Sequence, residues 1–168
     1  MKPAIQDLVN PYGVCFGCGP ANQDGLQLKS YWADDNEHVQ CIITPERRFN
    51  GWPGLVYGGF LAMVIDCHSN WTVIANHYKK ELRDFSSKPK IDCVTGHLSI
   101  KYLKPTPMDV PLLFSGHVEG EVSRKTRVIV EVYAGDVLTV KAENLFVRVD
   151  THNLADQAHH PNNPHTVG

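Results

Sequence analysis

The sequence predicts an α+β fold in which one long central helix is wrapped by a curled antiparallel sheet. One stretch of the chain has the apolar spacing of a buried helix, and the other regular segments alternate as strands do, with turn-forming residues between them. The chain has 168 residues, of which 42% are hydrophobic and 20% charged, and this size and composition are typical of one globular core. We therefore expect a single domain.

Charge and hydropathy exclude two classes of function. The formal net charge is −2, so the chain lacks the basic field that nucleic-acid-binding proteins use. The longest unbroken apolar stretch, residues 60–65, is far shorter than the roughly 18 residues that indicate a membrane span. Residues 1–10 also lack a signal-peptide core. We therefore expect a cytoplasmic protein with neither a nucleic-acid nor a membrane partner.

The two ends of the chain differ in composition from its middle. Residues 1–25 are rich in Gly, Pro and Asn and are expected to form an irregular lead-in rather than a packed element. Residues 151–168 are polar, with four histidines, and are expected to be a disordered tail. The folded domain is therefore predicted to span residues 26–150.

The first half of this domain predicts a hairpin and then the helix. Residues 26–33 and 37–43 are extended runs separated by three turn-forming residues. The loop 49–59 follows, with four glycines and one proline. From Gly59 to about His77, apolar residues recur at spacings of three and four, and the first half of this segment is apolar on nearly every side. A largely buried helix is predicted there.

The second half of the domain predicts strands. Residues 97–102 alternate between apolar and polar, and residues 112–122, 125–133 and 137–149 follow as further extended runs. The tripeptide Ala134-Gly135-Asp136 is a tight turn, so the last two runs should pair antiparallel.

The five cysteines do not form a disulfide framework, because their number is odd and their spacing irregular, so reduced thiols are expected. Cys15 and Cys18 have the spacing of half a zinc site. A structural zinc site normally takes four ligands, and neither a second CxxC nor an HxxxH pair follows in the domain. We therefore interpret this pair as turn residues and expect no metal.

Three motifs occur in order: Cys15-x-x-Cys-Gly-x-x-Asn-x-x-Gly-Leu, Gly51-x-Pro-Gly-x-x-Tyr-Gly-Gly-x-x-Ala-x-x-x-Asp and Thr95-Gly-His-Leu-Ser-Ile-Lys-Tyr-Leu-Lys-Pro. Together they resemble the hotdog-fold acyl-CoA thioesterases of the phenylacetate-pathway and thioesterase-superfamily type. The resemblance covers residues 15–149. It implies the hotdog fold, an acyl-CoA substrate and a homodimer or homotetramer. Coenzyme A would be part of the substrate, and no separate cofactor is expected.

Thioester hydrolysis needs a held water, a carboxylate that takes its proton, and donors for the developing oxyanion. Gly58 and Gly59 lie at the predicted helix N-terminus, where unpaired N–H groups and the helix dipole suit an oxyanion hole. The resemblance makes Asp66 the general base or a nucleophile, with Thr95 helping to hold the water. It also suggests that Asn50 orients the carbonyl.

Two geometrical conditions accompany this assignment. Asp66 lies roughly 10 Å along the helix from Gly59, too far for one carbonyl to reach both. In the resembling family, the helix start of one subunit faces the Asp of the other. Strand alternation places Thr95 opposite Leu98, so its approach to Asp66 needs a bulge at Gly96 or the partner subunit.

Three residues are expected to bind the substrate. Tyr57 occupies a position where the family commonly has His, and Tyr donates a hydrogen bond but is no base at neutral pH. Arg124 and Lys125 lie at the start of a predicted strand and suit the phosphates of coenzyme A, although basic residues also guard solvated strand edges.

Other interpretations of these residues remain open. Asp66 could simply face solvent on an amphipathic helix, and the Gly58-Gly59 pair could be a tight turn packed against the sheet. A non-catalytic acyl-CoA-binding protein is the main alternative function, because Tyr57 departs from the family pattern. A hotdog hydratase or dehydratase is a further alternative, which would need a His paired with an acid.

Overall fold

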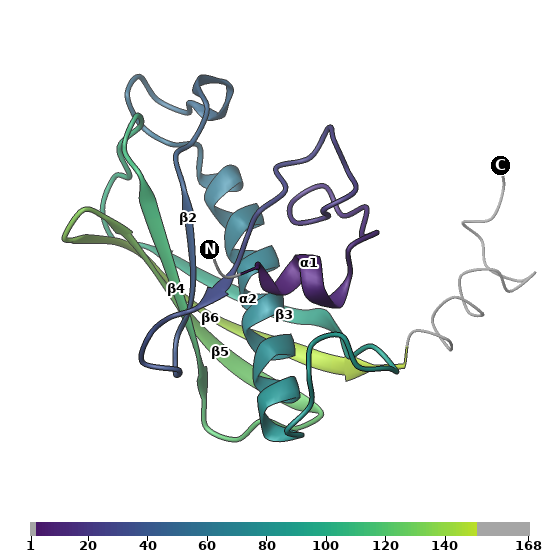
Figure 1. The fold of residues 1–168 in the computed structure, drawn as a ribbon. Coiled ribbons are helices and arrows are strands. Elements are labelled where there is room, and N and C mark those ends of the chain that lie inside the picture. The colour runs from purple at the N-terminus through teal and green to yellow at the C-terminus, as the bar shows by residue number, and fades with distance from the viewer. Residues whose placement is uncertain (1–2, 151–168) are drawn as a thin grey trace, which may run out of the picture.

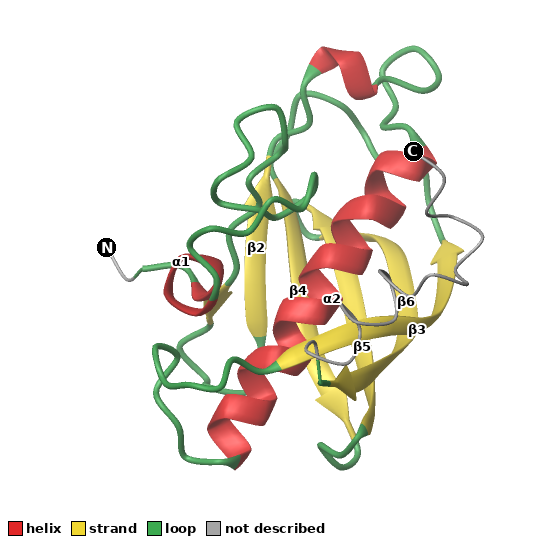
Figure 2. Cartoon of the chain, turned by 90° about the vertical axis from the view of Figure 1, so that its right-hand side faces the viewer, coloured by secondary structure: helices red, strands yellow, loops and turns green. Residues whose placement is uncertain are grey.

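The computed structural model describes residues 3–150, and the predicted tail lies outside this range. The α+β class is confirmed: a long helix, α2 (Gly58–Lys80), lies against one face of a six-stranded antiparallel sheet (Figure 2). The strands are β1 (Tyr31–Trp32), β2 (Val39–Ile43), β3 (Asp92–Tyr102), β4 (Leu112–Glu119), β5 (Lys125–Ala134) and β6 (Val137–Val149). Their order is β1-β2-β4-β5-β6-β3, which leaves β3 at one edge of a hotdog fold. A 3₁₀ turn, η1 (Arg47–Phe49), precedes α2.

The core lies between α2 and the face of the sheet that the helix covers. The most central strand residues are completely buried: Phe114, Val128, Val130, Val132, Val140, Ala142 and Phe146. Burying one such aliphatic or aromatic side chain stabilises the fold by about 1.5–3 kcal/mol. No helix within residues 3–150 has the length and apolar character needed to cross a bilayer.

The helix approaches β4 closely at Gly116. A Cβ on this residue would lie 2.6 Å from the Thr72 hydroxyl oxygen and 3.3 Å from the Nε2 of His68. Real Cβ atoms do not approach other atoms to 2.6 Å, so glycine is required for this helix–sheet spacing. The position of α2, and of every site residue on it, therefore depends on this contact.

The prediction of an irregular lead-in is wrong for α1 (Ile5–Val9), a single helical turn. Ile5 and Val9 lie four residues apart, on one side of this turn, and both are buried in the main core. A turn this short is too brief to show a helical period in the sequence. Figure 1 shows α1 and the loop after it beside α2, on the side away from β4 and β5.

A buried hydrogen-bond chain connects α1 to the helix and the sheet. The Gln6 amide donates to Ser30 Oγ at 3.0 Å, and Ser30 Oγ lies 3.0 Å from Nδ1 of His68. The Nε2 of His68 is 3.1 Å from the carbonyl oxygen of Val39. Since a carbonyl only accepts, Nε2 carries the proton and Nδ1 accepts from Ser30. His68 is therefore neutral and fully hydrogen-bonded.

We predict that stability falls as the pH drops below neutral because of His68. Burial lowers its pKa from 6.5 to about 4, so only the unfolded chain takes up a proton here between these values. The stabilising contribution is complete above pH 6.5 and is lost as the pH falls towards 4. The free energy of unfolding falls by up to about 1.4 kcal/mol for each pH unit in this range. Urea unfolding across this range should be less pH-dependent in His68→Gln than in the wild type, whereas the exposed-site control His97→Gln should match the wild type.

Candidate functional site

Asp66 and Thr95 meet on the half-buried face of α2 that lies beside β3. The Thr95 hydroxyl donates to Asp66 Oδ1 at 2.6 Å. The contact is possible because the pairing of β3 with β6 shifts by one residue, from Thr95–Phe146 to His97–Leu145, so that Gly96 is the extra residue of a bulge. Of the two alternatives considered from the sequence, a bulge at Gly96 or the partner subunit, the bulge is the one that brings Thr95 to the helix.

The bond from Thr95 holds the carboxylate of Asp66 in one orientation. It occupies Oδ1, and Oδ2 has no hydrogen-bond partner within residues 3–150. A carboxylate oxygen of this kind can accept a proton from water, and the Thr95 hydroxyl oxygen can accept the other water hydrogen. The pair can therefore bind and deprotonate one water molecule.

The start of α2 forms a second group of candidate residues. Tyr57 is the N-cap residue, and no side chain caps the helix there. The N–H groups of Gly58 and Gly59, in the first turn, have no backbone acceptor in the described part of the chain. The Tyr102 hydroxyl donates to the carbonyl of Gly58 at 2.8 Å and fixes the end of β3 to the helix start. The unpaired N–H groups of Gly58 and Gly59 can donate to an oxyanion.

The aromatic ring of Tyr57 lies against Gly59. A Cβ on Gly59 would be 2.5 Å from Cε1 of this ring, so the ring covers part of the helix start. More than half of Tyr57 is nevertheless exposed to solvent. Burial and the neighbouring Tyr57 raise the pKa of Tyr102, which keeps the Tyr102 hydroxyl protonated and able to donate. An exposed aromatic side chain therefore flanks the two glycines.

Asn50 lies near the same helix start, but its side chain is used within its own loop. The N–H of Gly54 donates to Asn50 Oδ1 at 3.2 Å, and Asn50 Nδ2 is 3.4 Å from the carbonyl oxygen of Gly51. The N–H of Tyr57 bonds to the carbonyl oxygen of Phe49, which closes the loop. Asn50 thus shapes the entrance to α2 through its own loop.

The two groups do not meet within one subunit. Gly59 and Asp66 are seven residues apart on the continuous helix α2, so their backbones lie roughly 10 Å apart along its axis. The distance anticipated from the sequence is thus present. A single thioester group can contact both only if a second subunit supplies one of them.

Arg124 lies elsewhere, in a cleft at the C-terminal end of α2, roughly 16 Å along the axis from Asp66. The cleft has a volume of about 1170 Å³. Its lining contains five cationic side chains, Lys80, Lys88, Lys90, Arg124 and Arg148, and two acidic ones, Glu81 and Asp150. Lys125 is the next residue of the chain but does not line the cleft. The surface therefore favours an anion.

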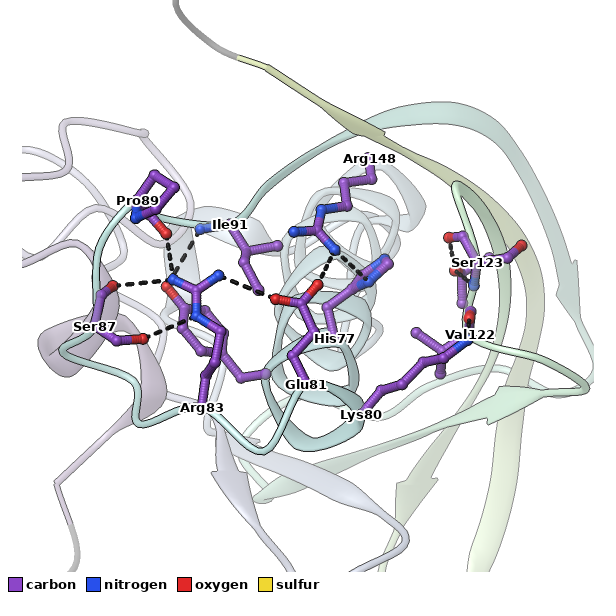
Figure 3. A network of polar contacts seen from close by, with 12 residues as sticks. His77, Lys80, Glu81, Arg83, Ser87, Pro89, Ile91, Val122, Ser123 and Arg148 are labelled. Atoms are coloured by element: carbon purple, nitrogen blue, oxygen red, sulfur yellow. Dashed lines mark hydrogen bonds and ion pairs between the residues drawn. The ribbon is translucent and has the colours of Figure 1, made fainter.

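Most cations of the cleft already have partners. Arg148 bonds to Glu81 and lies 3.4 Å from Nδ1 of His77 (Figure 3). Burial and this guanidinium lower the pKa of His77, which favours the neutral ring. Lys80 donates to the Val122 carbonyl at 2.6 Å. By contrast, Arg124 and Lys88 form no ion pair with another residue of the described range, so they are the side chains available to a bound anion.

Two residues of α2 close to Asp66 were not identified from the sequence. Asn70 follows one turn later, and its Oδ1 is buried without a hydrogen-bond partner in residues 3–150. Cys67 is the next residue, and its Sγ lies 3.8 Å from Sγ of Cys15. Hydrogen bonding by Cys67 lowers the pKa of Cys15 to about 5, and the same contact raises the pKa of Cys67. Neither feature has a local sequence signal, because both depend on packing.

Several solved structures share this fold. A thioesterase superfamily protein from Shewanella loihica PV-4 is 29% identical, and the match covers 77% of this chain and 97% of that one with a TM-score of 0.60. A second thioesterase superfamily protein is 27% identical over 87% of this chain and 70% of its own, with a TM-score of 0.62. A hypothetical thioesterase protein from Streptococcus pneumoniae TIGR4, solved with coenzyme A, is 20% identical over 73% of this chain and 88% of its own, with a TM-score of 0.58.

No protein-family model matches the chain, and no curated protein matches it. The structural neighbours are named thioesterase superfamily proteins, so the resemblance predicted from the three sequence motifs is confirmed.

Proposed function

We propose that the protein is an acyl-CoA thioesterase that hydrolyses its substrate to a free acid and coenzyme A at a site shared by two subunits. The observation that carries this proposal is the hydrogen bond from Thr95 to Asp66, which holds a carboxylate in place to accept a proton from water. Further support comes from the structural neighbours, one of which was solved with coenzyme A.

In the proposed reaction, Asp66 takes a proton from the water that it shares with Thr95, and the water oxygen attacks the thioester carbon. The carbonyl oxygen becomes an oxyanion, which the N–H groups of Gly58 and Gly59 of a second subunit stabilise. The tetrahedral intermediate then collapses, the carbon–sulfur bond breaks, and the thiolate of coenzyme A leaves. Asp66 returns its proton to this sulfur, so the carboxylate is ready for the next cycle.

The free edge of β3 suits the required dimer. Within residues 3–150, β3 pairs only with β6, and it exposes Val94 and Tyr102. An antiparallel pairing of two β3 edges centred near Ser99 would place Thr95 of one copy opposite Tyr102 of the other. Since Thr95 contacts Asp66 and Tyr102 contacts Gly58, this pairing brings the two half-sites together.

The cleft at the C-terminal end of α2 suits the phosphate groups of coenzyme A. Arg124 and Lys88 are its cations without an ion pair in the described chain, and an arginine can bind phosphate through two parallel hydrogen bonds. Lys125 lies next to the cleft and would add charge at its rim. The acyl end of the ligand would then extend along α2 towards Asp66.

One observation favours the alternative of a non-catalytic acyl-CoA-binding protein. The ring of Tyr57 lies against Gly59, next to the amides that the hydrolytic reaction needs. Binding requires neither these amides nor a base. A hydratase has less support, because His68, the histidine nearest to Asp66 in the chain, is buried with both ring nitrogens hydrogen-bonded.

A panel of short, long and aromatic acyl-CoAs tests the proposal. We expect release of free thiol from at least one of them, measured with a thiol reagent, at a rate that saturates with substrate. Binding by calorimetry without thiol release would instead establish the binding protein. Loss of enoyl-CoA absorbance without thiol release would establish the hydratase. Either of these results would contradict hydrolysis.

A further inference from the structure

Three cysteines form a compact cluster outside the proposed hydrolytic site. The Sγ atoms of Cys15, Cys18 and Cys67 all lie within 4.8 Å of one another. Cys18 and Cys67 are buried, whereas Cys15 is exposed. Two of these residues come from the lead-in and the third from α2, so the cluster joins segments that are far apart in the sequence. A ligand bound here would connect the lead-in to the helix.

The spacing of the sulfur atoms fits a metal ion better than a disulfide. Sulfur ligands placed tetrahedrally around zinc at about 2.3 Å are about 3.8 Å from one another. The distance between Sγ of Cys15 and Sγ of Cys67 is 3.8 Å. A disulfide requires a separation of about 2 Å, so forming one would require the loop and the helix to move closer.

The loop around Cys15 is shaped to bring its sulfur atoms to α2. Gly17 faces Cys67 so closely that a Cβ on it would lie 2.4 Å from the Cys67 Sγ. The backbone N–H groups of Gly17 and Cys18 point to the sulfur of Cys15. Such amide donors stabilise negative charge on a thiolate, which is the form that binds metal. A side chain at Gly17 would separate the two parts of the cluster.

We propose that Cys15, Cys18 and Cys67 bind a zinc ion, with the fourth coordination position open on the exposed side of Cys15. Binding would release the proton of each ligand that is still a thiol. The sequence interpretation found only half a zinc site because the third sulfur comes from α2 and not from a second local pair. The ion would attach the lead-in to α2 one residue after Asp66 and so restrain the position of this residue.

Metal analysis of the full chain, expressed with added zinc and then dialysed, tests the proposal. We expect about one zinc ion per chain in the wild type. Addition of Co²⁺ to the metal-free protein should produce the charge-transfer absorption of thiolate ligands. Since removing even an outer partner of a metal ligand weakens binding about 10- to 100-fold, Cys67→Ala should lose at least as much Co²⁺ affinity.

The matched control is Cys41→Ala, because Cys41 is also buried and lies outside the cluster. This control should keep the metal content and the Co²⁺ spectrum of the wild type. Cys15→Ala removes an exposed ligand and tests the same point if Cys67→Ala fails to fold.

Two results would overturn the proposal. One is a wild-type protein that binds neither Zn²⁺ nor Co²⁺. The other is unchanged zinc content and an unchanged Co²⁺ spectrum in both Cys67→Ala and Cys15→Ala, since the metal would then bind elsewhere in the chain. These readouts do not involve thioester turnover, so they are independent of the proposed hydrolytic function.

Discussion

Asp66→Asn is expected to lower kcat for acyl-CoA hydrolysis by a hundredfold or more, the usual size of a general-base effect. The amide keeps the size of the carboxylate, and its oxygen can still accept the hydrogen bond that Thr95 donates at 2.6 Å. It cannot take a proton from water. Binding of acyl-CoA, measured by calorimetry, should therefore be unchanged while thiol release falls.

The matched control for this variant is Asp109→Asn. Asp109 is exposed and has a φ of 62°, a backbone conformation that asparagine tolerates well. The Asp109→Asn variant should therefore hydrolyse acyl-CoA at the wild-type rate.

Thr95→Val should lower kcat as well. Thr95→Ser keeps the hydroxyl, so this variant should retain most of the wild-type kcat. Equal kcat values in the wild type and Asp66→Asn would remove Asp66 from the chemistry.

Mixing two inactive variants is expected to restore activity if the site is shared between subunits. In Gly59→Val the new side chain would occupy the space of the Tyr57 ring and block the helix-start amides, so this variant should be nearly inactive, as should Asp66→Asn. After subunit exchange, a heterodimer contains one site with both wild-type halves and one site with neither. Random exchange produces heterodimers in half of the molecules, so the mixture should reach about a quarter of the wild-type activity.

The control for this experiment is a mixture of the same variants before exchange, which should show only the sum of their residual activities. Each variant should also elute at the wild-type position in size-exclusion chromatography. If full exchange leaves the activity at that sum, then Gly59 and Asp66 of the same subunit form the site, and the dimeric arrangement is wrong.

Much of the fold could be predicted because apolar residues recur at regular helical or strand spacings along most of its segments. The helix predicted from Gly59 to about His77 extends from Gly58 to Lys80, and the last strand has the predicted bounds. The predicted hairpin is also present, although β1 is limited to Tyr31–Trp32. The turn of α1 was missed because five residues cannot show a helical repeat.

The candidate site was only partly predictable. The resemblance related Thr95 to Asp66, whereas strand alternation alone placed Thr95 on the opposite face, and the shift at Gly96 that brings the two together could not be fixed from the sequence. The contact of Cys67 with Cys15, and that of Tyr102 with Gly58, join residues far apart in the chain, and no local pattern encodes them. The same reason explains why the cleft that contains Arg124 could not be located before the ends of α2 and β6 were placed together.

The bulge in β3 makes the facing of Thr95 depend on which strand residue is left unpaired. Cys93 and Thr95 share the face of Leu98 because Gly96 has no partner on β6. If β3 paired regularly through Gly96, the residues from Asp92 to Thr95 would face the opposite way, and Thr95 would turn from the helix to solvent. Loss of Gly96 would instead leave Thr95 opposite Phe146 and His97 opposite Leu145, as they are now. Related chains that lack this residue should therefore keep the contact between the threonine and the helix carboxylate.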